Sequence, residues 1–283
     1  MKRKKADKDN YLKIIYLLAA IVIIETVCLI ASYRKSEPRN KPEELIAQKQ
    51  KQEEKNPGPQ PLMSFGKIAL VLDDWGYSLN NLPALKQINE PLTIAILPKR
   101  EYSAAIARAV QEFKQEAILH LPLEPKKEKK SHLEPETITV NMPKEKVRAI
   151  LEADFKSLPG IKGISNHMGS LATENEALMR TIFIELKRHK LYFLDSFTGK
   201  TVCKSVAQKE GLPYARRQVF LDNQTDEDYI LSQMETLAKI ARQSGSAIGI
   251  GHDRPKTLSV LLKAIPDFKK RGYQFVFVSQ LAR

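Results

Sequence analysis

From Gly66 onward the sequence alternates short apolar runs with amphipathic segments of helical period, and few architectures are compatible with that order. The alternation is typical of strands and helices built around a mostly parallel sheet. We expect strands at residues 67–72, 92–97, 117–121, 163–165, 191–194, 218–221, 247–250 and 274–278. The clearest helices are expected at residues 102–115, 144–158, 175–189, 226–243 and 257–271. This number of strands is enough to close a barrel.

Acidic, histidine and asparagine residues stand at the ends of most of these predicted strands. They are Asp73, Asp74, His120, Asn166, His167, Asp195, Asp222 and His252. In a parallel barrel the carboxyl ends of all strands open on one face, where active sites are built. We therefore expect these side chains, which are far apart in the sequence, to converge.

The adjacent carboxylates Asp73 and Asp74 follow an apolar strand. Such a pair can divide two tasks, because one carboxylate can bind a metal while the other acts as a base beside it. Capping of the next helix is the alternative use of an aspartate at this point. His120 and Glu124 lie four residues apart, and imidazole with carboxylate suits zinc. A strand-end histidine satisfied by a hydrogen bond is the alternative for His120.

His167 lies in the polar segment SNHMGS, where the small residues after it would let a substrate approach the backbone. His252 lies in IGIGHDRP, where glycines on both sides of Ile250 leave room beside the ring. A histidine in this place can protonate a leaving amine, or it can simply be held by Asp253 or another carboxylate. Asp195 and Asp222 are expected either to orient His252 or to cap helices.

In this order the segments LVLDDWG, AILHLPLEP, GISNHMGS, FLDS, VFLD and AIGIGHDRPKTL resemble the divergent polysaccharide deacetylase family, a branch of the NodB-like carbohydrate esterases. The resemblance spans residues 66–281, and SNHMGS followed by GHDRP is its most specific part. It implies an α/β fold, a distorted (β/α) barrel. It also implies deacetylation of a polysaccharide.

The resemblance assigns a role to each motif residue that it covers. Asp73 is implied to be the catalytic base, Asp74 a metal ligand and His252 the catalytic acid. The chain departs from the NodB-like H-x-x-x-H pattern, because His120 is followed by Glu124 where a second histidine is expected. We therefore expect His167 to supply the missing imidazole, so that Asp74, His120 and His167 bind one divalent metal, zinc being the best match. The expected supporting or substrate-binding residues are Glu124, Asn166, Asp195 and Asp222.

The implied reaction is hydrolysis of N-acetyl groups on a cell-envelope glycan. One alternative is a non-catalytic envelope module that binds glycan or protein on the same fold, because a fold does not guarantee its usual chemistry. A second is a serine hydrolase using Ser170 with His252 and Asp222, although the sequence lacks a G-x-S-x-G elbow.

The N-terminal region predicts a membrane anchor. Residues 11–31 are apolar except for Lys13, Glu25 and Thr26, and they match the roughly 20 residues that cross a bilayer as a helix. The basic residues 1–10 are expected to stay in the cytoplasm, and residues 32–65 have the composition of a solvated linker. This topology is a single-pass protein of the cytoplasmic membrane, with residues 66–283 in the periplasm or outside the cell.

Several other classes of function lack their sequence signals. The formal net charge is +13, yet no DNA- or RNA-binding signature accompanies it, so no nucleic-acid partner is expected. The chain has no G-x-G-x-x-G, and we expect no nucleotide cofactor. Cys28 and Cys203 are poorly placed for a disulfide or for a cysteine zinc site.

Overall fold

The computed structural model describes residues 20–31, 65–126 and 133–283. The chain divides into two compact units, residues 1–60 and 61–283. In the first unit, residues 20–31 form a helix with exposed side chains. No helix in the described residues combines the length and the apolar character that a membrane crossing requires. The rest of the expected anchor (11–19), the basic N-terminus (1–10) and residues 32–64 of the expected linker lie outside the described residues.

The second unit alternates strands and helices along the chain, as expected. The strands are β1 (Lys67–Trp75), β2 (Thr93–Ile96), β3 (Glu116–Leu123), β4 (Gly163–Met168), β5 (Tyr192–Asp195), β6 (Tyr214–Arg216), β7 (Val219–Phe220), β8 (Ser246–His252) and β9 (Gln274–Phe275). The α-helices are α3 (Leu82–Lys86), α4 (Ser103–Glu112), α5 (Lys144–Ser157), α6 (Glu176–Arg188), α7 (Cys203–Glu210), α8 (Glu227–Ser244) and α9 (Pro255–Lys270). Two short 3-10 helices follow β4 and β9, namely η2 (Ala172–Glu174) and η3 (Val278–Gln280).

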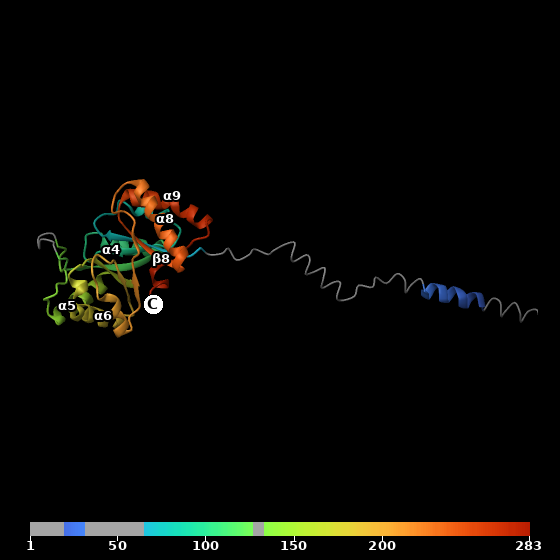
Figure 1. Ribbon diagram of the computed structural model, residues 1–283, viewed down its shortest axis with the longest axis horizontal. Coiled ribbons are helices and arrows are strands. Elements are labelled where there is room, and N and C mark those ends of the chain that lie inside the picture. Colours follow the sequence, from blue (N-terminus) through green and yellow to red (C-terminus); the bar gives the residue numbers. More distant parts are fainter. Residues whose placement is uncertain (1–19, 32–64, 127–132) are drawn as a thin grey trace, which may run out of the picture. The chain divides into compact units, whose positions relative to one another are not determined.

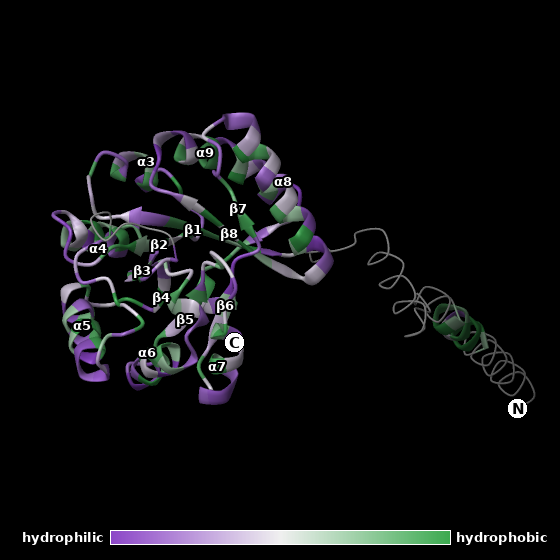
Figure 2. Ribbon diagram, turned by 60° about the vertical axis from the view of Figure 1, so that its left-hand side comes forward, coloured by the Kyte–Doolittle hydropathy of each residue, from purple (hydrophilic) through white to green (hydrophobic). Residues whose placement is uncertain are grey.

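All strands belong to one parallel sheet in the order β6-β5-β4-β3-β2-β1-β8-β7, with β9 paired to the start of β1. The α/β class and the parallel sheet are as predicted, but the barrel is open. Strands β6 and β7 follow each other in the chain yet lie at opposite ends of the sheet, and no ladder joins them in the described chain. The helices lie around the outside of the sheet (Figures 1 and 2).

Two predicted details were wrong. The expected strand 274–278 ends at Phe275, because the chain turns into η3. Val276 and Val278, whose apolar character suggested a strand, are instead buried in the smaller of the two hydrophobic clusters. Strand β6 was not predicted, since three residues are too few to give a period-2 pattern.

Side chains on successive residues of β1 point to opposite faces of the sheet and feed two cores. Ile68, Leu70 and Leu72 belong to the large cluster under the helices, whereas Ala69 and Val71 belong to a smaller cluster inside the curl. Asp73 continues the alternation of Ala69 and Val71 along β1. Its carboxylate therefore points to the same face as the smaller cluster, near the carboxyl end of the sheet.

Candidate metal centre

Strand β1 bulges where the two aspartates occur. Between Leu72 and Trp75 its register against β2 shifts by one residue, and Asp74 adopts a left-handed conformation with φ of 65°. Adjacent residues in a regular strand point to opposite faces, whereas a bulge redirects one of them. Aspartate tolerates this conformation better than most residues. The bulge therefore lets the side chains of both Asp73 and Asp74 approach His120 at the carboxyl end of the sheet.

The register of β3 against β4 brings two histidines to the same place. His120 lies opposite Ser165, and His167 lies two residues further along β4 on the same face. The two imidazole rings meet edge to face, with centroids 5.0 Å apart. Ser165 Oγ lies 2.7 Å from His120 Nδ1. This contact orients the ring so that Nε2 faces Asp74.

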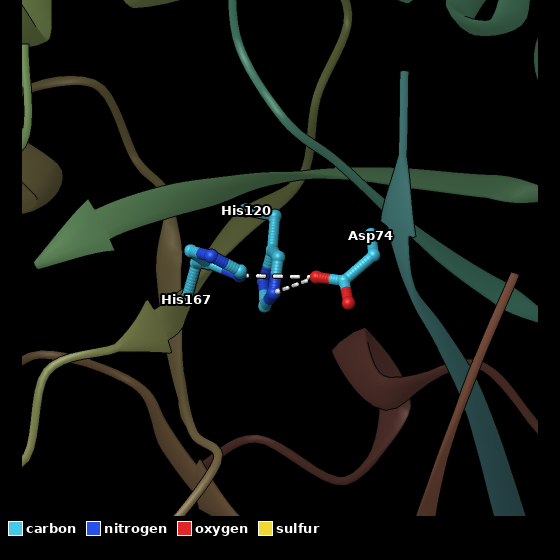
Figure 3. A group of neighbouring side chains, drawn as sticks. All are labelled: Asp74, His120 and His167. Atoms are coloured by element: carbon cyan, nitrogen blue, oxygen red, sulfur yellow. Dashed lines mark hydrogen bonds and ion pairs between the residues drawn. The ribbon is translucent and has the colours of Figure 1, made fainter. Parts of the chain in front are cut away.

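Asp74, His120 and His167 present ligand atoms that all lie within 4.8 Å of one another. One oxygen of Asp74 is 3.2 Å from His120 Nε2 and 3.0 Å from His167 Nδ1, and both contacts converge on it in Figure 3. One carboxylate and two imidazoles are a donor set that zinc and similar divalent ions accept. Three protein ligands would also leave a position open for water or substrate. The residues present fit a catalytic metal.

The charges in this group depend strongly on one another. Burial alone would raise the pKa of Asp74, but hydrogen bonds and charge from His120 and His167 outweigh it and hold that pKa well below its usual range. Burial would lower the pKa of His120, yet the nearby carboxylates Asp73 and Asp74 raise it. The site therefore keeps an ionised carboxylate beside imidazole nitrogen. An ionised carboxylate is the form that binds a divalent cation.

Asp73 is buried beside the triad. Its Oδ2 lies 3.6 Å from His120 Nε2, while Oδ1 is buried and has no hydrogen-bond partner in the described residues. Burial raises the pKa of Asp73. A buried carboxylate oxygen without a donor is costly unless a ligand or water completes it, and a raised pKa improves a carboxylate as a base near neutral pH.

His252 stands across the ladder from Asp73, as its partner in the pairing of β1 with β8. Its Nδ1 lies 2.7 Å from Asp222 Oδ1, and its backbone N–H donates to Asp222 Oδ2 at 2.8 Å. The hydroxyl of Thr257 donates to the same Oδ2 at 2.6 Å. A Cβ at Gly251 would meet the Thr257 methyl at 2.9 Å, so the glycine keeps this arrangement open. Asp222, and not Asp253, therefore orients His252.

Two of the other expected residues hold the backbone near the centre. Glu124 Oε2 accepts the N–H of Val140 at 2.8 Å, so its side chain braces a loop and does not join the histidines. Asn166 accepts the N–H of Ser196 and donates to Met168 O, at 2.9 and 2.7 Å.

The remaining expected residues have no contact with His252 in the described residues. Asp195 accepts from the hydroxyl of Tyr214 at 3.0 Å. Ser170 accepts from the backbone N–H of Lys126 at 3.1 Å. The serine-hydrolase arrangement therefore has no geometric support.

The sequence reasoning missed Ser165 and Thr257, which support His120 and His252. Ser165 stands two residues before His167, so strand alternation was a usable signal for it. Thr257 lies inside α9, and nothing in the sequence marks it as a partner of Asp222.

Comparison with known proteins identifies the family and the fold. A family model described as divergent polysaccharide deacetylase matches residues 70–282. The chain belongs to this family. The uncharacterized protein YibQ of Escherichia coli strain K12 is 34% identical over 201 residues, which cover 71% of this chain and 62% of YibQ. The chain thus spans less than two thirds of the length of that relative.

Solved structures share the fold of this member of the divergent polysaccharide deacetylase family. The uncharacterized protein ATU2773 from Agrobacterium tumefaciens C58 superposes with a TM-score of 0.74 at 21% identity, covering 79% of this chain and 92% of that one. BA3943 from Bacillus anthracis, a CE4 family pseudoenzyme, superposes with a TM-score of 0.50 at 14% identity, covering 78% and 66%. The fold of carbohydrate esterase family 4 is therefore present here.

Proposed function

We propose that this divergent polysaccharide deacetylase is a metal-dependent hydrolase that removes N-acetyl groups from a cell-envelope glycan. The observation that carries the proposal is the convergence of Asp74, His120 and His167, within 4.8 Å, beside a buried carboxylate and a carboxylate-bound histidine. Zinc is the divalent ion we propose for this donor set. When bound, it would supply a Lewis acid that polarises the acyl carbonyl and makes water more acidic.

The residues around the triad divide the remaining tasks. Asp73 would accept a proton from the attacking water, because Oδ1 has no partner in the described residues and burial raises the pKa of the carboxyl group. His252 would donate a proton to the departing amine. Burial alone would lower the pKa of His252, but the hydrogen bond and charge of Asp222 raise it. His252 therefore keeps its proton to higher pH and can donate it.

A non-catalytic glycan- or protein-binding module on the same fold is the second candidate. BA3943 of Bacillus anthracis is a pseudoenzyme, so the fold exists without turnover. What favours catalysis here is that acid, base and candidate ligands are all present. The discriminating experiment is to load the purified chain with zinc and to assay release of acetate from N-acetylated oligosaccharides. Acetate release that chelator abolishes and zinc restores is the expected result.

We also propose that residues 11–31 anchor the chain in the cytoplasmic membrane with residues 66–283 on the outer side. Support comes from the sequence, in which basic residues precede the apolar run. Protease added to intact spheroplasts should remove the folded unit. Complete protection of that unit would contradict this topology.

A further inference from the structure

Four arginines lie at or just beyond the carboxyl ends of strands, on the side of the sheet that carries the candidate metal centre. They are Arg100, Arg216, Arg217 and Arg254. Glu134 pairs with the first and Asp222 with the last. For Arg216 and Arg217 the described residues provide no carboxylate within the 4.0 Å of an ion pair. Two adjacent cations therefore stand at the junction of β6 and β7 without an ion pair in the described chain, and the carboxylates of Asp195 and Asp73 act on the charge of Arg217 only from beyond ion-pair distance.

Arg217 is held in a fixed place. Its Nε donates to Ser196 O at 2.7 Å and its Nη2 donates to Phe197 O at 2.8 Å. The guanidinium lies 3.6 Å from the centre of the Phe220 ring. Burial lowers the pKa of Arg217 to about 10, so the group still carries its charge at neutral pH. The donors on Nη1 and the second N–H of Nη2 have no partner in the described residues.

The guanidinium is linked to the proposed catalytic acid, His252, through the Phe220 ring. Phe220 stacks on His252 with ring centroids 6.1 Å apart and planes inclined by 16°, so Arg217, Phe220 and His252 form one layered stack. Ser196 directly follows β5, and its Oγ is buried without a hydrogen-bond partner in the described part of the chain. The Ser196 hydroxyl and the remaining N–H groups of Arg217 lack hydrogen-bond partners in the described residues, and a polar ligand would provide them.

We propose that Arg217, with Arg216 beside it, binds a carboxylate carried by the glycan, so that the site selects acidic N-acetylated sugars. The inference rests on the proposed deacetylase function and specifies its substrate. The planar fork of arginine matches the two oxygens of a carboxylate, and the free donors of Arg217 are enough for one such group. A half-buried guanidinium without a direct ion pair has lost hydration, and the ligand would compensate for that loss.

The charges of the site explain why recognition of an acid needs this arrangement. Asp73 would repel a carboxylate that approached the centre, and the charge of Arg217, which contacts His252 only through the Phe220 ring, would offset part of that repulsion. Arg216 is exposed and lies 4.7 Å from the ring centre of Phe197, which is itself 39% exposed. Arg216 therefore extends the cationic surface toward solvent, where it would meet the next acidic sugar of the glycan.

The test measures glycan binding to the zinc-loaded full-length protein by calorimetry, with Asp73→Asn in every sample to prevent turnover. The probes are an N-acetylhexosamine tetrasaccharide whose alternate sugars carry a carboxylate, and the same compound with the carboxyls reduced to alcohols. The acidic probe should bind about 10- to 100-fold more tightly, as expected for charge-assisted hydrogen bonds. Arg217→Gln should remove most of this preference and Arg216→Gln part of it.

Arg242→Gln is the matched control, because it removes the same charge at the opposite end of β1, where Arg242 lies over Phe65. It should leave the preference unchanged. Arg216→Gln changes an exposed side chain and decides the question even if Arg217→Gln does not fold. Equal binding of the two probes would overturn the inference while leaving the deacetylase proposal intact. A preference that survives both substitutions would also overturn it. Absence of binding to either probe, together with no acetate release by the zinc-loaded protein that retains Asp73, would remove both proposals.

Discussion

Replacing Asp222 by Asn should move the alkaline limb of the pH–rate profile to lower pH. Asp222 is fully buried and accepts hydrogen bonds from the His252 ring, the His252 backbone N–H and Thr257. Burial alone would lower the pKa of His252, and the hydrogen bond and charge of Asp222 raise it. A group whose pKa is raised by folding is stabilised in its protonated form, and that contribution is lost as pH rises through the folded-state pKa. Without the Asp222 charge, His252 should lose its proton at lower pH.

The size of the shift follows from the interaction removed. A hydrogen bond to a charged group contributes about 1.5–3 kcal/mol, and about 1.36 kcal/mol corresponds to one pH unit, so the limb should move by about 1–2 pH units. Initial rates of acetate release against pH measure it, and proton NMR titration follows His252 directly among five histidines.

The matched control for this substitution is Asp226→Asn, because asparagine can still accept the Tyr229 N–H at the start of α8. Its profile should not move. If the NMR pKa of His252 falls in Asp222→Asn while the alkaline limb stays in place, His252 is not the catalytic acid. If neither changes, Asp222 does not set the pKa of His252.

Three further substitutions test separate parts of the site. Asp73→Asn should retain the metal but lower the rate of acetate release by about 10²–10⁴-fold, measured by metal analysis and an acetate assay on one preparation. Ser165→Ala should weaken metal affinity about tenfold, because the His120 ring loses its orienting contact, and a competitive chelator titration measures this change. Glu124→Ala should leave metal content unchanged yet reduce the free energy of unfolding by about 1–3 kcal/mol in urea, since the Val140 N–H loses its acceptor.

Much of the site was predictable because it depends on strand ends. Asp73 and His252 each follow an apolar run, His120 lies in the last half of β3, and parallel strands bring their carboxyl ends to one side of the sheet. The sequence could not decide whether Asp195 or Asp222 orients His252. That choice depends on strand order, since β7 lies beside β8 while β5 lies near the other end of the sheet. Strand order comes from tertiary packing, which local periodicity does not encode.

Other features were hidden because they arise from single-residue geometry. The bulge in β1 depends on the left-handed conformation of Asp74, and an aspartate pair by itself does not reveal it. The open barrel depends on β6 and β7, which are three and two residues long and separate at Arg217. Arg217 received no role from the sequence, because its contacts with Ser196, Phe197 and Phe220 exist only in the folded chain.

The most direct measurement of the central claim is the number of metal ions bound per chain together with acetate release, in the same samples of the original protein and of His167→Ala. The proposed centre predicts one divalent ion per chain in the original protein, with acetate release that depends on it. It also predicts that His167→Ala loses at least ~10–100-fold in metal affinity and loses acetate release with it. Full metal occupancy and activity in His167→Ala, or an original protein that binds no metal under any loading condition, would contradict it.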